Sequence, residues 1–267
     1  MAGRVDVCCF DKTGTLTGED LVVEGVAGIN SAAPRELTAV HDTSLETTLT
    51  LSAAHALVLL DDGIVGDPME KTTLESLNWK LGKADIVAPT QLLTQTAKES
   101  KKDEGKPQSP HLATVGIKRR FQFSSTLKRM STVSVVALPN TQKRRTFVAV
   151  KGAPETLKGM YVDVPEAYES TYKWFAQRGS RVLALGYKWA DMQENQINKL
   201  AREEVEEGLT FAGFLVFHCP LKPDAVKTIK MLNDSSHRVR QHQSLPCPCP
   251  SLSTYADVIL LTRLDSA

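Results

Sequence analysis

Residues 4 to 17 read Arg4-Val-Asp-Val-Cys-Cys-Phe-Asp-Lys-Thr-Gly-Thr-Leu-Thr17. The run up to Phe10 is rich in β-prone side chains, which predicts a buried strand that ends at Asp11. Such a strand holds the carboxylate rigidly, and the turn at Gly14 can direct backbone N–H groups toward an anion. The segment therefore predicts a carboxylate site at the end of a strand, and together with the helices and strands that alternate along the rest of the chain it indicates an α/β fold.

The composition is that of a packed protein without a strong electrostatic field. Of the 267 residues, 42% are hydrophobic and 24% are charged, and the formal net charge is +1. This balance gives no support to nucleic acid as a partner. The five cysteines form no Cys-x-x-Cys pair, which favours a reducing, cytosolic setting. The longest apolar runs fall short of the ~20 residues that cross a bilayer, so a soluble chain is expected.

Helices and strands alternate along the rest of the chain. Asp67-Pro-Met-Glu70 combines a capping aspartate, a proline in the first turn and a glutamate three residues after the cap, which predicts a helix over 68–81. Other helical patterns cover residues 36–60, 154–160, 165–178, 192–207 and 223–232. Strands are predicted over residues 114–123, 131–138, 145–150, 181–187 and 210–217, the first three as antiparallel neighbours.

Two segments lack a pattern that would predict packing. Residues 97–110 are charged, small and proline-containing, and are interpreted as a flexible surface loop. Beyond Val239 the sequence includes three prolines within residues 246–250 and shows no periodicity. No packed structure is expected there, and residues 258–261 are interpreted as a local apolar patch.

The loop that starts at Asp11 has the residue types needed for phosphoryl transfer. Asp11 can attack a phosphorus atom, Lys12 can offset the developing charge, and Thr13 can contact phosphate or Mg²⁺. The alternative for an isolated Asp-x-Thr is a capped turn without chemistry. The complete seven-residue string after a strand favours the chemical interpretation.

Asp11-Lys-Thr-Gly-Thr-Leu-Thr17 resembles the signature of the P-type ATPases, a branch of the haloacid-dehalogenase-like phosphotransferases. The resemblance implies that Asp11 accepts phosphate from ATP and that Mg²⁺ is held by Asp11 and the backbone carbonyl of Thr13. Many phosphatase relatives carry a second aspartate two residues after the first, where this chain has Thr13. Loss of that acid/base predicts a longer-lived acyl phosphate, which suits a pump.

Four further segments resemble the nucleotide-binding motifs of that family, in the same order. They imply that the adenine stacks on an aromatic ring, and that a glutamate, lysines and an arginine surround the nucleotide. The residues concerned are Glu70, Phe123, Lys128, Met130, Lys151, Gly152 and Arg181. Taken singly, Phe123 could be a core residue, Glu70 a capping-box partner of Asp67, and Lys128 and Arg181 surface charges. Ser125 stands where several family members have an arginine.

The sequence around Asp11 resembles the type V subfamily of this family, and its endoplasmic-reticulum branch most closely. Two further segments support the same resemblance, Leu21-Val-Val-Glu-Gly-Val-Ala27 and Phe217-His-Cys-Pro-Leu-Lys-Pro-Asp224. This resemblance implies an integral membrane parent in the endoplasmic reticulum membrane that removes misplaced transmembrane helices. The present chain would then lie on the cytosolic face of that membrane, or be soluble in the cytosol if it exists alone.

The resemblance covers about residues 5–239. The Thr-Gly-Asp and Gly-Asp-Gly-x-Asn-Asp loops of the family do not occur in the sequence. The expectation is therefore a fragment that diverges from the family near Arg240, followed by an unrelated and disordered tail at residues 240–267.

The predicted architecture has two parts. Residues 26–210 form an α+β nucleotide-binding domain, inserted into an incomplete haloacid-dehalogenase-like Rossmann phosphorylation domain made of residues 1–25 and 211–239. The expected function is ATP binding at the phosphoacceptor site of a transport ATPase, without sustained turnover. Two alternatives stay open, namely a free-standing phosphatase of the same superfamily and an inactive nucleotide-binding module.

Overall fold

The structure is a computed structural model that describes residues 7–11, 14–18, 21–61, 63–95, 113–138, 144–192, 194–235, 237–243 and 257–263. The chain divides into two compact units. The larger unit comprises residues 22–218, and the smaller unit combines residues 1–21 with residues 219–267. The loop predicted over residues 97–110 lies outside the described residues.

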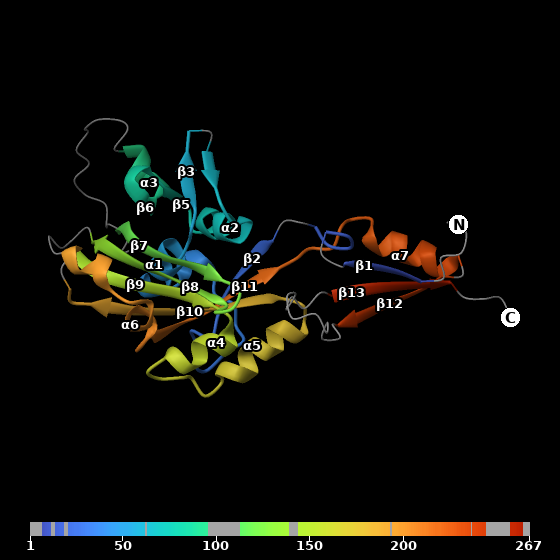
Figure 1. Cartoon of the computed structure of the whole chain (residues 1–267). Helices are drawn as coiled ribbons and strands as arrows, with labels where there is room; N and C mark the ends of the chain where they lie inside the picture. Colours follow the sequence, from blue (N-terminus) through green and yellow to red (C-terminus); the bar gives the residue numbers. More distant parts are fainter. Residues whose placement is uncertain are drawn as a thin grey trace. The chain divides into compact units, whose positions relative to one another are not determined.

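An eight-stranded sheet organises the larger unit (Figure 1). Its strand order is β2-β11-β10-β9-β8-β7-β6-β5, and every pair of neighbours is antiparallel. The strands are β2 Val22–Ala27, β5 Trp79–Leu81, β6 Ile86–Pro89, β7 Thr114–Ser124, β8 Arg129–Ala137, β9 Arg144–Gly152, β10 Arg181–Ala190 and β11 Thr210–His218. The prediction that β7, β8 and β9 are antiparallel neighbours is confirmed.

Helices cover both faces of this sheet. On β8, the Thr132 hydroxyl donates to the carbonyl of Ala53 in α1 (Leu45–Ala53), at 3.1 Å. The next residue, Val133, packs instead in a buried cluster with Tyr168 of α5 (Tyr168–Gln177). Because successive side chains of a strand point to opposite faces, α1 and α5 cover opposite faces of the sheet. Figure 1 shows α5 beside the short α4 (Pro154–Leu157).

Several predicted helices are shorter in the structure than in the sequence pattern, and the one predicted over 192–207 is a 3₁₀ turn at Glu194–Lys199 followed by the short α6 (Arg202–Glu206). The helix predicted over 36–60 is α1 alone, and Val58–Leu60 form strand β3, which pairs with β4 (Gly63–Val65). The Asp-Gly dipeptide in this part of the sequence favours a hairpin over a helix end. The helix predicted over 68–81 is α2 (Pro68–Ser76), because Asn78 adopts a left-handed backbone with φ 57° before β5 begins.

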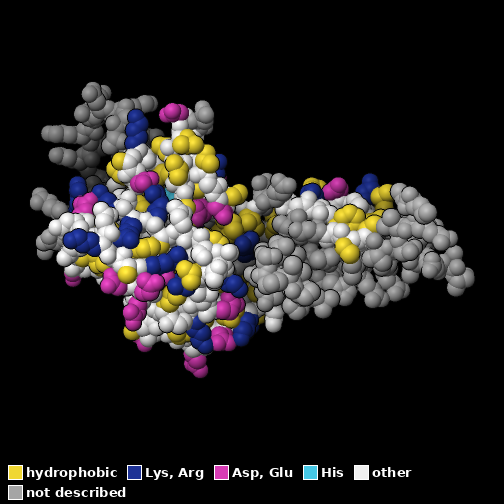
Figure 2. Space-filling model, viewed as in Figure 1, with side chains coloured by type: hydrophobic (Ala, Val, Ile, Leu, Met, Phe, Trp, Pro, Cys, Tyr) yellow, Lys and Arg dark blue, Asp and Glu magenta, His cyan; other side chains and the backbone are white. Residues whose placement is uncertain are grey.

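The β3–β4 hairpin carries exposed apolar side chains. Val58, Leu60 and Val65 are 50%, 54% and 56% exposed. Figure 2 shows hydrophobic side chains gathered over this part of the larger unit. The remaining short elements of the unit are α3 Thr90–Gln95, α6 Arg202–Glu206 and four 3₁₀ turns at Val40–Asp42, Lys83–Asp85, Lys158–Met160 and Glu194–Lys199.

The smaller unit contains a three-stranded antiparallel sheet and helix α7 (Ala225–Asp234). Its central strand is β13 (Asp257–Arg263), which pairs with β1 (Val7–Asp11) on one side and β12 (His237–Gln243) on the other. The expectation that nothing beyond Val239 packs is therefore wrong for these two segments. Residues 258–261, interpreted from the sequence as a local apolar patch, lie in β13, and β13 forms hydrogen bonds with a strand on each side.

The domain borders also differ from the prediction. Residues 211–218 were assigned to the phosphorylation domain, but they are part of β11 and pair with β10 in the eight-stranded sheet. Strand β2 pairs with β11 and lies wholly in the larger unit. Among the described helices, none has the length and apolar character needed to span a membrane.

Candidate functional site

A cavity of about 240 Å³ lies in the larger unit, between the end of β9, the start of α2 and the β7–β8 hairpin. Its walls contain six of the residues that the sequence assigned to nucleotide binding, namely Glu70, Phe123, Met130, Lys151, Gly152 and Arg181. The other lining residues are Ala56, Gly66, Asp67, Met69 and Leu183. The fold thus brings together side chains from four separate segments of the chain.

Glu70 is the fixed acceptor of this cavity. Its side chain is almost buried, and Oε2 accepts a 2.8 Å hydrogen bond from the backbone N–H of Ala56. Oε1 accepts a 2.8 Å bond from Lys151 Nζ. The capping aspartate Asp67 receives the Met69 N–H at 2.7 Å. Both oxygens of the Glu70 carboxylate are therefore held by other residues that line the cavity. A capping-box contact with Asp67 does not account for these hydrogen bonds.

Gly152 allows the strand end to approach the β7–β8 hairpin closely. A Cβ at this position would lie 2.6 Å from the carbonyl oxygen of Lys128, which is too close for any larger residue. That carbonyl accepts the Ala153 N–H at 2.9 Å, and Lys128 itself has a left-handed backbone with φ 51°. Lys128 thus contributes its backbone to the hairpin, and its side chain is not among the described lining of the cavity.

Phe123 and Met130 provide apolar surfaces of different kinds. Phe123 is 63% exposed, which is unusual for an aromatic ring on a strand, whereas Met130 is 2% exposed. Both line the cavity. An exposed aromatic ring can hold a flat aromatic ligand by stacking, and a buried thioether can add an apolar contact. Arg181, at the start of β10, is exposed at the same cavity.

The loop after Asp11 is described only in part. The backbone of Asp11 ends β1, while Lys12 and Thr13 lie outside the described residues. Gly14 adopts φ 80°, and its carbonyl accepts a hydrogen bond from Lys222 Nζ. The Gly18 N–H donates to the Pro220 carbonyl at 2.8 Å. Residues 219–222 therefore form hydrogen bonds with the C-terminal part of the loop that was predicted to bind phosphate.

Comparison with known proteins shows extended similarity to transport ATPases. The chain is 50% identical to the endoplasmic reticulum transmembrane helix translocase spfA of Aspergillus fumigatus, over 89% of this chain and 19% of that protein. It is 48% identical to the corresponding translocase of Saccharomyces cerevisiae, over 89% of this chain and 18% of that protein. The chain is a homologue of the P-type transport ATPases.

A probable manganese-transporting ATPase of Arabidopsis thaliana extends the relationship, with 39% identity over 88% of this chain and 18% of that protein. The present chain therefore spans about a fifth of the length of these curated relatives. No protein-family model matches the chain. The resemblance inferred from Asp11 to Thr17 and from the downstream motifs is confirmed at the level of sequence relationship.

In this P-type ATPase homologue, sequence reasoning missed the residues that hold the β7–β8 hairpin. Glu206 is 2% exposed, and its carboxylate accepts bonds from Arg129 Nε at 2.6 Å, Arg202 Nε at 2.8 Å and the Ser131 hydroxyl at 2.8 Å. Burial raises the pKa of Glu206, but these hydrogen bonds outweigh burial and the pKa is lowered overall. Glu206 is 77 positions from Arg129, so no local pattern could have indicated the pairing.

His55 was also missed, and it lies next to Ala56 behind the cavity. It is 1% exposed, its Nδ1 accepts the Leu57 N–H at 3.2 Å, and its Nε2 has no partner among the described residues. Burial, and then the positive charges of Lys151 and Arg120, lower the pKa of His55 to about 3. The ring is therefore neutral at physiological pH. Among the described residues, no group of three or more His, Cys, Asp or Glu side chains could hold a metal.

Proposed function

We propose that the larger unit binds ATP, with the adenine in the cavity lined by Phe123, Met130 and Glu70. The observation that carries this proposal is that six residues assigned by motif resemblance, from separate segments of the chain, line one cavity. Taken singly, Phe123, Glu70 and Arg181 each had a structural alternative. Their common location supports a ligand that uses an aromatic face, a carboxylate and a cation together.

Glu70 gives the cavity a basis for choosing between purines. Its carboxylate is an acceptor held in place by the Ala56 N–H and by Lys151. The exocyclic amino group of adenine can donate to this carboxylate. Guanine presents a carbonyl oxygen at the equivalent position, which a carboxylate repels. We therefore expect ATP to bind more tightly than GTP.

The size of the cavity indicates which part of the nucleotide it covers. Its volume of about 240 Å³ is below the ~300–1,000 Å³ of pockets that enclose a complete small ligand. A base fits inside, and the ribose and phosphates extend outward. Arg181 is exposed at the rim, where its guanidinium can meet the phosphates.

The smaller unit is proposed to carry the phosphoacceptor. A carboxylate oxygen of Asp11 would attack the γ-phosphorus in line, forming an acyl phosphate while the bond to ADP breaks and ADP leaves. Mg²⁺, bound by Asp11 and the Thr13 carbonyl, would neutralise phosphate charge. We further propose that the parts of this unit predicted from the sequence, residues 1–21 and 219–239, derive from an incomplete haloacid-dehalogenase-like domain, although the described sheet of the unit is antiparallel. We expect ATP binding without sustained turnover.

The relatives' names suggest a cellular role for a full-length parent. We propose that the parent couples ATP hydrolysis to membrane transport or to removal of transmembrane helices. Its nucleotide site would face the cytosol at the endoplasmic reticulum membrane. The relatives described above as helix translocases are the basis for this choice.

Two measurements test the proposal separately. In calorimetric titration of the whole chain, ATP should bind, Phe123→Ala should weaken binding, and GTP should bind more weakly. A chain that binds neither nucleotide would refute the site. Incubation with γ-labelled ATP then tests the chemistry: sustained phosphate release that disappears in Asp11→Asn would contradict the expectation of no turnover.

A further inference from the structure

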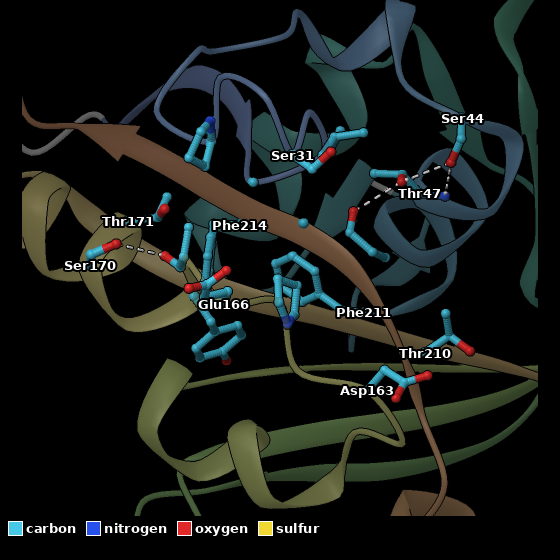
Figure 3. Close-up of a pocket in the computed structure, with 18 of the residues that line it drawn as sticks. Ser31, Ser44, Thr47, Asp163, Glu166, Ser170, Thr171, Thr210, Phe211 and Phe214 are labelled. Atoms are coloured by element: carbon cyan, nitrogen blue, oxygen red, sulfur yellow. Dashed lines mark hydrogen bonds between the residues drawn. The ribbon is translucent and has the colours of Figure 1, made fainter.

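A second and larger cavity, of about 780 Å³, lies in the larger unit (Figure 3). It shares no lining residue with the candidate nucleotide site. Its walls come from the loop after β2, the first turns of α1 and α5, and the beginning of β11. The second cavity is therefore separate from the candidate nucleotide site and is lined by different residues.

The cavity forms where β2 leaves part of β11 uncovered. Strand β2 pairs with residues 214–218 of β11, so the described ladder between these strands does not reach Thr210 to Gly213. The pairing of β11 with β10 is also irregular here, since Leu185 faces Gly213 and Gly186 faces Phe211. At this bulge Ala212 has no partner residue on β10, and its carbonyl accepts the Thr47 hydroxyl at 3.0 Å.

The floor of the cavity is aromatic. Phe211 and Phe214 lie with their ring centroids 4.9 Å apart in an edge-to-face arrangement, and Tyr168 packs against both. Figure 3 shows the two phenylalanines at the centre of the lining residues. The floor approaches the backbone closely, because a Cβ on Gly28 would lie 3.0 Å from the Phe214 ring. Such a surface suits an apolar or aromatic ligand body.

The walls of the cavity are polar and their only described charges are negative. Asp163 and Glu166 line it and are exposed, and neither forms an ion pair with another described residue. The described lining contains no lysine or arginine. The cavity therefore favours a positive charge next to its aromatic floor.

Thr171 adds an independent observation. It lines the cavity and is 1% exposed, yet its hydroxyl has no hydrogen-bond partner among the described residues. A buried hydroxyl without a partner is costly, so a site that contains one is often completed by a ligand or water. The neighbouring Thr47, by contrast, is satisfied by Ala212.

The geometry points to a binding site for a small organic cation, an amine with an apolar or aromatic body. The body would lie on the partly exposed Phe211, against which the buried Phe214 packs. The ammonium group would donate to the carboxylates of Asp163 and Glu166. The Thr171 hydroxyl would form its missing hydrogen bond with the ligand.

Three probes of one size test this assignment on the whole chain: phenethylamine, 2-phenylethanol and phenylacetate. Amide chemical shifts should move around the cavity with phenethylamine, and its affinity should exceed that of the neutral alcohol and of the acid. The double variant Asp163→Asn/Glu166→Gln should weaken phenethylamine about fivefold or more and leave 2-phenylethanol unchanged.

The controls separate this site from the nucleotide site. Glu169→Gln removes a carboxylate of α5 that is paired with Lys158 and Lys173, and should leave amine affinity unchanged. Phe123→Ala should also leave it unchanged. The assignment is overturned if the three probes bind equally, if shifts occur away from the cavity, or if the double variant binds phenethylamine as the unmodified chain does.

Discussion

Lys151 Nζ lies 2.8 Å from Glu70 Oε1, although the two residues are 81 positions apart in the chain. Their side chains are only 15% and 8% exposed, so the pair is largely withdrawn from water. It ties the end of β9 to the first turn of α2, and the Ala56 N–H fixes the other oxygen of Glu70. The cation and the carboxylate of the candidate site therefore form an ion pair with each other.

The first prediction concerns the stability that this pair provides. Lys151→Met should lower the free energy of unfolding by about 1–3 kcal/mol, because it leaves a nearly buried carboxylate without its charged partner. Urea denaturation measures the change. The double variant Lys151→Met/Glu70→Gln should recover part of the loss, since an amide costs less to bury than a carboxylate.

Lys173 offers a matched control on the surface. Its ammonium pairs with Glu169 at 2.6 Å, and both side chains are about half exposed. Lys173→Met should leave the stability almost unchanged, because solvent screens such pairs. Equal effects of Lys151→Met and Lys173→Met would mean that burial adds nothing to the Glu70 pair.

The second prediction separates binding from folding on strand β7. Phe123→Ala should weaken ATP binding by about 1–3 kcal/mol, the range seen when an aromatic ring that stacks on a base is removed. Its effect on unfolding should be small, because the ring is 63% exposed. Phe121→Ala should do the reverse and lower stability by about 2 kcal/mol, since Phe121 packs against the buried cluster. Parallel titration and denaturation of the two variants checks the contrast.

The third prediction uses two buried threonines of the second cavity. Thr171→Val should raise the free energy of unfolding by about 1 kcal/mol, because it removes a buried hydroxyl that has no described partner. Thr47→Val should lower it by about 1 kcal/mol, because the Ala212 carbonyl loses its donor. Thermal unfolding without ligand measures both. If both variants were destabilised alike, the Thr171 hydroxyl would have a partner in solution.

Local patterns were sufficient for the parts of the site that lie within one segment. The antiparallel strands around Met130 and Lys151 were predicted from β-prone runs, and the Asp67 cap from residue type. The residues proposed for nucleotide binding were selected by motif resemblance, and six of them line one cavity in the structure. The contacts that hold them in place could not be predicted, because each joins distant segments.

Three features show what the sequence could not resolve. The Glu206 carboxylate meets Arg129 across 77 positions, and only the packing of α6 on β8 brings them together. Val58–Leu60 were included in a predicted helix because of their apolar pattern, but they form a strand that pairs with Gly63–Val65. Strand β13 follows a proline-rich segment, and its pairing with β1 spans almost the whole chain. In each case a long-range contact decides the outcome, and periodicity does not report such contacts.

The fourth prediction concerns acid stability through His55. Its pKa is lowered to about 3 in the folded chain by burial, then by Lys151 and Arg120, whereas Asp85 acts in the opposite direction. In the unfolded chain the pKa is the ordinary value of about 6.5. Between these two values the unfolded state binds the extra proton. His55 therefore stabilises the folded chain fully above pH 6.5, and this stability is lost as the pH falls toward 3.

The test compares the chain with His55→Asn, whose side-chain oxygen can still accept the Leu57 N–H. Below pH 6 the unmodified chain should lose up to about 1.4 kcal/mol per pH unit more than the variant, because one proton is bound on unfolding. Glu206 also loses its stabilising effect in acid, but it is present in both proteins and cancels in the difference. Urea midpoints measured from pH 7 to pH 4 give the two slopes. Parallel slopes would show that His55 titrates at its ordinary pKa, and hence that water reaches the ring next to Ala56.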